Sequence, residues 1–317
     1  MSGRLPDREL GSTGLVLSSV TLGGGPLGSM LENFGYEVAE EQAIELVGDV
    51  LRSEIRTIDT ANGYSAGRSE RRIGTAIARF GLPDDVVVVT KVDADGRDYS
   101  GDRVRASLRE SRERLGLPGP LPLVHLHDPE FHDFADLTAL GGAVDALVEA
   151  RESGAVSHIG LAGGRVQDMR RYLDLGVFDV LLVHNRWTLV DRSGGDLIDD
   201  ALERGVGVVN AAVFGGGILA DDSGRATGYG YRPAPPATLK AITAMRDACT
   251  RWSTDLRTAA LRFSTRDPRF ASTIVGISKP ERVEPTIAAA SADLPDGLWE
   301  ELESLLPPRA HWLDYRD

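Results

Sequence analysis

The chain has 317 residues, and its 35 lysines and arginines face 48 aspartates and glutamates, which gives a formal net charge of −13. This acidic balance argues against nucleic acid as the main partner, because phosphate binding favours positive charge. Hydrophobic residues make up 42% and charged residues 26%, which is typical of a folded globular protein and excludes an intrinsically disordered one.

Two further features concern location. No run approaches the roughly 18 apolar residues of a membrane-spanning helix, and residues 1–10 lack the apolar core of a secretion signal. Cys249 is the only cysteine, so an intrachain disulfide and a thiolate metal cluster are excluded. We therefore expect a cytoplasmic protein with no membrane partner.

Short runs of valine, isoleucine and leucine alternate with longer amphipathic stretches along the chain. Continuous runs of this length predict strands that are buried on both faces, as in parallel sheets. In chain order the predicted strands are Ser19–Gly23, Arg56–Asp59, Val86–Lys91, Leu121–His127, Val156–Leu161, Val180–His184, Gly207–Ala212 and Ser272–Ile277.

The stretches between these strands show helical spacing, as in Ile44, Val47 and Leu51. The predicted helices are Glu41–Arg52, Ser69–Ala78, Asp102–Leu115, Leu137–Ser153, Arg165–Leu175, Asp196–Arg204 and Pro280–Ala290, with two more between Pro235 and Ser264. We expect long loops at Gly28–Tyr36 and Ala220–Pro236.

Strand–helix repeats without a domain linker predict an α/β fold, a single (β/α)8 TIM barrel domain spanning residues 1–317. A doubly wound open sheet is the alternative. In such barrels the chemistry lies at the carboxyl ends of the strands.

Polar residues gather at four of the predicted strand ends. Asp59 ends the second strand and Tyr64 follows it, Lys91 ends the third, His127 ends the fourth, and His184 ends the sixth. A tyrosine is normally a reluctant acid, but a neighbouring ammonium such as Lys91 lowers its pKa. Such a set moves a proton to or from a substrate oxygen while a cofactor moves a hydride. Alternatively, Lys91 and Asp59 form a structural ion pair at the barrel rim.

In these stretches the sequence resembles the aldo-keto reductase family. The resemblance extends in order over nearly the whole chain, and its matching segments are Glu9–Leu15, Ile58–Tyr64, Ser69–Glu70, Val89–Lys91, His127–Pro129, Gly154–Gly160, Gly215–Leu219 and Thr273–Ser278. It implies an N-terminal β-hairpin that plugs the barrel floor. It also implies a catalytic tetrad of Asp59, Tyr64, Lys91 and His127, in which Tyr64 is the general acid and base.

The resemblance is closest to the subgroup of D-threo-aldose, L-fucose and L-galactose dehydrogenases. Gly23–Gly28, Ser65–Arg72 and Asn185–Leu189 carry this placement. It implies an aldose sugar or a small aldehyde as substrate, with a pyridoxal-type dehydrogenase as an alternative.

The resemblance also implies a dinucleotide bound across the fifth to eighth strands. Ala162 and Gly163 replace the Ser–Asn pair that commonly holds the carboxamide in the family, and His184 or Asn185 replaces the usual glutamine. The predicted cofactor-binding residues are Gly24, Ala162, Gly163, His184, Asn185, Ala212, Phe214, Gly216, Gly276, Ser278, Lys279 and Arg282. Lys279 and Arg282 suit the 2′-phosphate of NADP, so the sequence favours NADP slightly over NAD, and no metal is expected.

Residues Gly23–Gly28 formally match the dinucleotide fingerprint G-x-G-x-x-G. A true fingerprint opens a helix directly after its strand, whereas here Pro26 intervenes. We interpret the segment as a loop with little bulk that can approach substrate or nicotinamide.

Two other functions stay open at this point. His125 and His127 place two imidazoles on one side of a strand, as in metal-dependent barrel hydrolases. A cofactor-sensing regulatory subunit without turnover is the other alternative.

Overall fold

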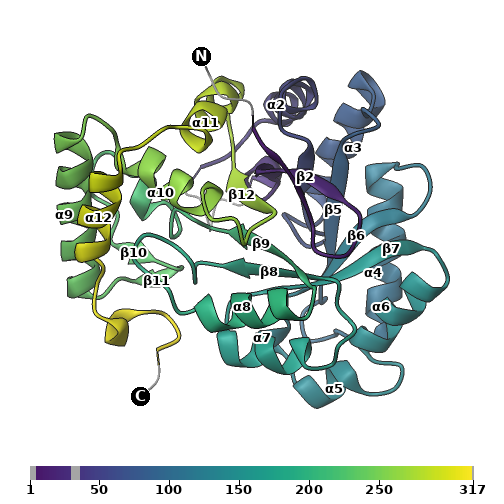
Figure 1. The fold of residues 1–317 in the computed structure, drawn as a ribbon. Coiled ribbons are helices and arrows are strands. Elements are labelled where there is room, and N and C mark those ends of the chain that lie inside the picture. The colour runs from purple at the N-terminus through teal and green to yellow at the C-terminus, as the bar shows by residue number, and fades with distance from the viewer. Residues whose placement is uncertain (1–4, 30–35, 316–317) are drawn as a thin grey trace.

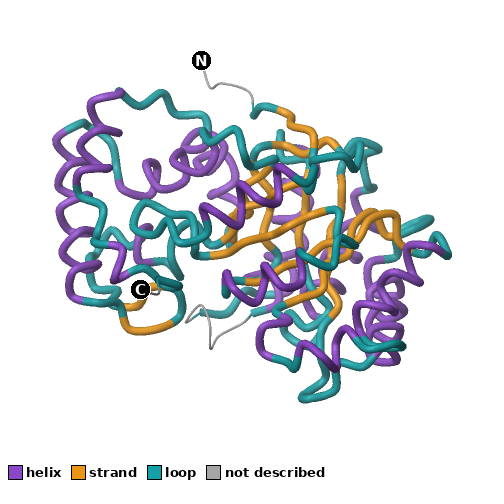
Figure 2. Tube along the Cα trace, turned by 60° about the horizontal axis from the view of Figure 1, so that its bottom comes forward, coloured by secondary structure: helices purple, strands orange, loops and turns teal. Residues whose placement is uncertain are grey.

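The computed structural model describes residues 5–29 and 36–315. Eight parallel strands close into a barrel in the order β12-β3-β4-β5-β6-β7-β8-β9, and helices surround them (Figures 1 and 2). The predicted TIM barrel is therefore confirmed, and the open-sheet alternative is excluded. The barrel strands are β3 (Val20–Gly23), β4 (Thr57–Asp59), β5 (Val87–Val92), β6 (Leu121–His127), β7 (Val156–Gly163), β8 (Val180–His184), β9 (Gly207–Ala211) and β12 (Ser272–Gly276).

The helices follow the strands and cover the outer face of the barrel (Figure 1). Their bounds are α2 (Glu40–Arg52), α3 (Arg68–Phe80), α4 (Gly101–Leu115), α5 (Phe134–Thr138), α6 (Ala143–Glu152), α7 (Val166–Leu173), α8 (Gly195–Glu203), α9 (Pro236–Arg251), α10 (Leu256–Thr265), α11 (Val283–Ala290) and α12 (Asp296–Ser304). No helix in the described ranges combines the length and hydrophobicity that crossing a membrane requires.

Local sequence sets the ends of α4. The hydroxyl of Ser100 accepts a hydrogen bond from the amide of Arg103 and so caps the first turn. Gly116 ends the helix with a φ of +62°, a left-handed conformation that glycine adopts without steric cost. The helix therefore ends at Leu115, as predicted.

The predicted helix Leu137–Ser153 is wrong in its first half, because the chain forms two helices, α5 and α6, separated by a turn. Gly141 has a φ of +74°, and a Cβ on Gly142 would lie 2.7 Å from the carbonyl oxygen of Asp136. This glycine pair turns the chain where helical spacing alone suggested continuity.

Two further differences lie in the late part of the chain. The predicted loop Ala220–Pro236 contains a small hairpin of β10 (Gly228–Tyr229) and β11 (Arg232–Pro233). Helix α12 was not predicted, and it packs beside α9 on one flank (Figure 1). Most of the predicted loop Gly28–Tyr36 lies outside the described residues.

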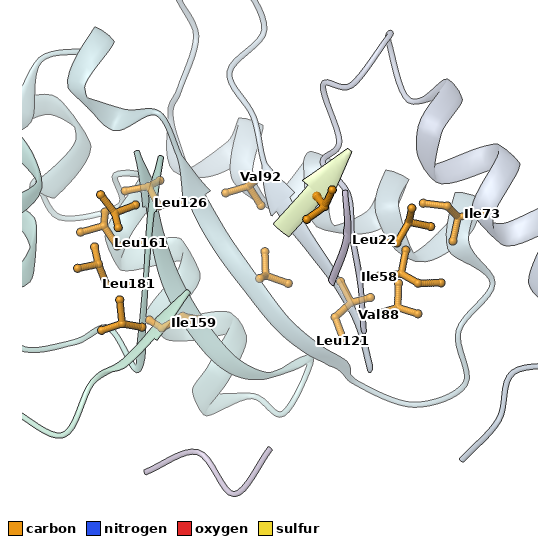
Figure 3. Close-up of a cluster of buried hydrophobic side chains, with 14 of the residues drawn as sticks. Leu22, Ile58, Ile73, Val88, Val92, Leu121, Leu126, Ile159, Leu161 and Leu181 are labelled. Carbon is orange, nitrogen blue, oxygen red and sulfur yellow. The ribbon is translucent and has the colours of Figure 1, made fainter. Parts of the chain in front are cut away.

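Strand side chains alternate between two apolar clusters. Outward residues pack under the helices in the main core, and Figure 3 shows Leu22, Ile58, Val88, Leu126 and Leu161 among them. Inward residues form a second cluster inside the barrel. Burial on both faces explains why these strands read as continuous apolar runs.

The N-terminal hairpin closes the amino-terminal end of the barrel. Strand β1 (Asp7–Glu9) pairs antiparallel with β2 (Val16–Ser18). Leu10 and Leu17 are 0% and 2% exposed and join the cluster inside the barrel. The predicted plug of the barrel floor is therefore confirmed, and any site must lie at the opposite end.

Candidate active site

Lys91 lies at the centre of a polar cluster at the carboxyl end of β5. Its ammonium donates to Oδ1 of Asp59 at 2.5 Å, to the carbonyl oxygen of Thr60 at 2.7 Å and to Oη of Tyr64 at 3.4 Å. An ammonium has three donors, so all of its hydrogen bonds are made within this cluster. The Lys91 side chain is only 2% exposed, and burial makes its orientation fixed.

Tyr64 lies on the loop that joins β4 to α3. Three successive residues after it, Ser65, Ala66 and Gly67, have φ values of 52°, 54° and 78°. Two of these carry side chains, for which the left-handed region is costly. Such strain is concentrated at functional sites. The turn brings the phenol edge-on to the imidazole of His127, with ring centroids 5.6 Å apart.

His127 ends β6 and is flanked by two carboxylates. Its Nδ1 lies 2.6 Å from Oδ1 of Asp93, and its Nε2 lies 3.9 Å from Oδ2 of Asp128. Burial would lower the pKa of His127, but Asp93 and Asp128 raise it above its ordinary value. The imidazolium form is therefore favoured at this position.

The pKa of Tyr64 differs from the sequence-based expectation. Burial raises the pKa of the phenol above its ordinary value, and the opposing effect of Lys91 does not cancel that rise. Burial would lower the pKa of Lys91, but Asp59 and Tyr64 raise it more, so the ammonium stays charged. In this state of the site Tyr64 is therefore protonated and ready to act as an acid.

The structure thus brings together Asp59, Tyr64, Lys91 and His127 within one hydrogen-bonded or ring-contact group. They come from the ends of three neighbouring strands, β4, β5 and β6. A protonated phenol beside an imidazolium can deliver a proton to one substrate oxygen.

His125 points into the barrel below His127 and is 1% exposed. Burial lowers its pKa well below the ordinary value, so it is neutral. Within the described ranges, the group of side chains with metal-compatible spacing is Asp128, Glu130 and His184. The pair of His125 and His127 is not part of that group, which removes the basis for the hydrolase alternative.

The predicted cofactor residues form an arc of the barrel mouth beside the tetrad. Apart from Gly24, which follows β3, they end or follow β7, β8, β9 and β12, which are neighbours in the sheet. Asn185 and Ala212 have left-handed φ values of 61° and 53°, directly after β8 and β9. Lys279 and Arg282 are exposed beside Ser278, at the start of the short helical turn Pro280–Arg282 that leads into α11.

Gly24 has a packing role that the sequence did not show. Its amide donates to the carbonyl oxygen of Asp59 at 2.7 Å, and a Cβ would lie 2.8 Å from both that oxygen and Oγ of Ser69. The missing side chain therefore lets this loop approach the strand that ends at Asp59. Within the described residues, the segment itself forms the short helical turn Pro26–Gly28, and the next described helix, α2, begins at Glu40. A cofactor contact at Gly24 stays a prediction.

At the mouth, the glycine-rich turn that follows β9 is suited to the phosphates of a dinucleotide. Gly215, Gly216 and Gly217 have φ values of 61°, 82° and 106°, and the amide of Gly216 donates to no acceptor among the described residues. Side-chain-free turns with available amides are suited to bind a pyrophosphate. Neither Lys279 nor Arg282 has an ion-pair partner within the described chain, so both cations are available.

Two carboxylates at the mouth were not singled out from the sequence. Asp93 lies two residues after Lys91, so the alternation of strand side chains places it on the same inward face as Lys91 if β5 is extended by one residue. That alternation is the signal that could have found it. Asp128 was noticed only as part of a motif, and nothing in the sequence shows that its Oδ1 lies 3.4 Å from Nε2 of His184.

The C-terminal tail forms one wall of the mouth. The amide of Leu313 donates to Oδ2 of Asp191 at 2.7 Å, and Arg186 donates through Nε to Asp314 at 2.9 Å. The tail is therefore attached to the loop after β8.

Comparison with known proteins identifies the family. The model of the aldo/keto reductase family matches residues 21–307. L-galactose dehydrogenase of Arabidopsis thaliana is 30% identical, with 95% of this chain and 94% of that protein covered. D-threo-aldose 1-dehydrogenase of a Pseudomonas species is 29% identical, with 92% and 94% covered. Pyridoxal 4-dehydrogenase of Microbacterium luteolum is 29% identical, with 94% and 96% covered.

Among solved structures, the holo form of an aldo-keto reductase from Bacillus halodurans shares the fold. Its TM-score is 0.78 at 21% identity, over 99% of this chain and 100% of that one. The chain belongs to the aldo/keto reductase family and is an NAD(P)-dependent oxidoreductase.

Proposed function

We propose that this aldo/keto reductase oxidises the anomeric carbon of an aldose, with Tyr64 as the group that takes up the proton. The observation that carries the proposal is the buried contact of Lys91 with both Asp59 and Tyr64 at the barrel mouth. The nicotinamide, when bound, accepts the hydride from the sugar carbon in oxidation and supplies it to a carbonyl carbon in reduction.

The residues of the chain act on the substrate oxygen. In oxidation, the ionised Tyr64 accepts the proton of the anomeric hydroxyl, and the charged Lys91 stabilises that phenolate. In reduction, the protonated Tyr64 gives its proton to the carbonyl oxygen. His127 donates from Nε2 to the same oxygen and orients it.

The polar residues that line the mouth support the proposal of a hydroxyl-rich substrate. Asp128 lies between His127 and His184, with contacts of 3.9 Å and 3.4 Å, and its side chain is 39% exposed. The pKa of Asp128 lies well below the ordinary value, because His127 and His184 outweigh the effect of burial. A charged carboxylate between two imidazoles can accept hydrogen bonds from neighbouring sugar hydroxyls.

The test is a screen of cofactor reduction with a panel of aldoses, pyridoxal and simple aldehydes. We expect turnover with an aldose, and Tyr64→Phe serves as the matched inactive control. Activity confined to aromatic aldehydes would reject the aldose proposal, and turnover of pyridoxal alone would support the pyridoxal-type alternative, which a relative of that name favours.

For the cofactor, we propose a preference for NADP over NAD. Lys279 and Arg282 are exposed at the start of the turn into α11, where they can bind a 2′-phosphate. Fluorescence titration with both dinucleotides measures the two affinities. Lys279→Ala should weaken NADP binding and leave NAD binding unchanged, and a clear preference of the unmodified protein for NAD would refute the proposal.

A further inference from the structure

Asp93, the residue directly after β5, contacts two catalytic segments with one carboxylate. Its Oδ1 lies 2.6 Å from Nδ1 of His127. Its Oδ2 accepts a hydrogen bond of 2.6 Å from the amide of Gly63, the residue before Tyr64. The carboxylate therefore links the imidazole of β6 to the loop that carries the phenol.

The local geometry makes this link close and shielded. A Cβ at Gly63 would lie 2.9 Å from Cγ of Asp93, so the approach depends on glycine. The side chains of His127 and Asp93 are 15% and 19% exposed, which limits competition from water. A hydrogen bond to an ionised group in such surroundings is stronger than a neutral one.

We propose that Asp93 is a positioning residue, which holds a proton on Nδ1 of His127, fixes the orientation of the ring and holds the Tyr64 loop against the same imidazole. The inference rests on the proposed function, in which Tyr64 and His127 act on one substrate oxygen. It adds a carboxylate to that machinery which never touches the substrate.

The consequence concerns the free nitrogen of the ring. Because Asp93 occupies Nδ1, only Nε2 of His127 faces the substrate. Asp128 cannot take over this role, since its 3.9 Å contact with Nε2 exceeds hydrogen-bond length. Asp93 therefore directs Nε2 toward the substrate. Its charge also favours the imidazolium, the form of the ring in which Nε2 carries a proton to donate.

Several charged or titratable groups surround the imidazole, so a test must isolate Asp93. Two carboxylates, Asp93 and Asp128, stabilise its charged form, whereas Lys91 opposes it. The other titratable neighbours are Asp59, Tyr64, Tyr99, His125 and His184; Tyr99 bonds to the backbone of His127, and His184 contacts Asp128.

The first readout is the titration of His127, followed by NMR of the imidazole in the cofactor-free protein and assigned by the signal that disappears in His127→Asn. Asp93→Asn should lower the pKa of His127 by about one unit or more, since an opposite charge at hydrogen-bond distance is lost. Asp95→Asn, an exposed site in the same loop, is the matched control and should leave it unchanged. An unshifted His127 in Asp93→Asn would overturn the inference.

A second variant keeps every charge and disturbs only the geometry. Gly63→Ala inserts a methyl group against Cγ of Asp93 and should also lower the pKa of His127. If Asp93→Asn does not fold, the pKa of His127 can still be measured in Gly63→Ala. An unchanged pKa of His127 in a folded Gly63→Ala protein would count against the link.

Kinetics then separate this inference from the proposed function. Asp93→Asn should reduce kcat by up to about 10²-fold, the scale expected for a misplaced catalytic group, with the dinucleotide affinity unchanged. If Tyr64→Phe stays active, the proposed function fails whatever Asp93 does. If Tyr64→Phe is inactive while Asp93→Asn keeps both the kcat and the His127 titration, only the present inference fails.

Discussion

The two ends of the barrel use left-handed backbone in different ways. At the floor, the turns after α3, α4, α6, α7 and α8 each place a glycine there, namely Gly81, Gly116, Gly154, Gly176 and Gly205. At the mouth, side-chain-bearing residues adopt the same conformation, namely Ser65, Ala66, Asp128, Asn185 and Ala212. Glycine takes this conformation freely, whereas other residues pay about 1–3 kcal/mol each.

The side chains follow the same division. The floor is closed by Leu10 and Leu17, which are buried among apolar strand residues. The mouth holds Lys91, Asp59 and His127, which are polar and largely buried. We infer that the floor carries stability and the mouth carries chemistry, where the five strained residues named above lie. The predictions below test this division, from the largest expected effect to the smallest.

Tyr64→Phe should show that the mouth can be disabled without loss of stability. Removing the phenolic hydroxyl takes away the proton donor, so we expect kcat to fall by about 10²–10⁴-fold. The free energy of unfolding and the dinucleotide affinity should change little, as measured by urea denaturation and fluorescence titration. Retained turnover would contradict the assignment of Tyr64.

Lys91→Met should lower both activity and stability, because the charge of Lys91 serves the chemistry of the mouth and also stabilises the fold. Asp59 would be left buried without its partner, which costs about 3–5 kcal/mol. Urea denaturation measures the loss, and the double variant Asp59→Asn with Lys91→Met should recover part of it. A single variant as stable as the unmodified protein would show that the pair does not stabilise the fold.

Leu10→Ala should affect the floor alone. The side chain is fully buried, so its truncation should cost about 2–5 kcal/mol of unfolding free energy. The specific activity of the folded protein should stay unchanged. Val16→Ala in the same hairpin is the control, since Val16 is 48% exposed, and an equal loss there would argue against the plug.

The pH dependence should sharpen the account of the mouth. Because the pKa of Tyr64 is raised, its phenolate is scarce at neutral pH. The oxidation rate should therefore rise about tenfold per pH unit toward alkaline pH, while reduction, which needs the protonated phenol, stays level. Measurements of kcat/KM in both directions test this, and an oxidation rate that falls with rising pH would contradict it.

Much of this arrangement was predictable from periodicity. The eight strands follow from apolar runs such as Val87–Val92, and parallel strands in a closed barrel place their carboxyl ends together. This logic puts Asp59, Lys91 and His127 at one mouth. Prediction from periodicity failed at Leu137–Ser153. Helical spacing continues there across a glycine pair at which the backbone turns.

The sequence by itself predicted the barrel, because strand periodicity is a local property, and its resemblance to the aldo-keto reductases implied the candidate tetrad. Only the tertiary structure decided two other matters. It placed Asp93 on His127, 34 residues apart, since that contact depends on the register of β5 against β6. It also raised the pKa of Tyr64 despite the neighbouring ammonium, since desolvation depends on how completely the folded chain removes the phenol from water.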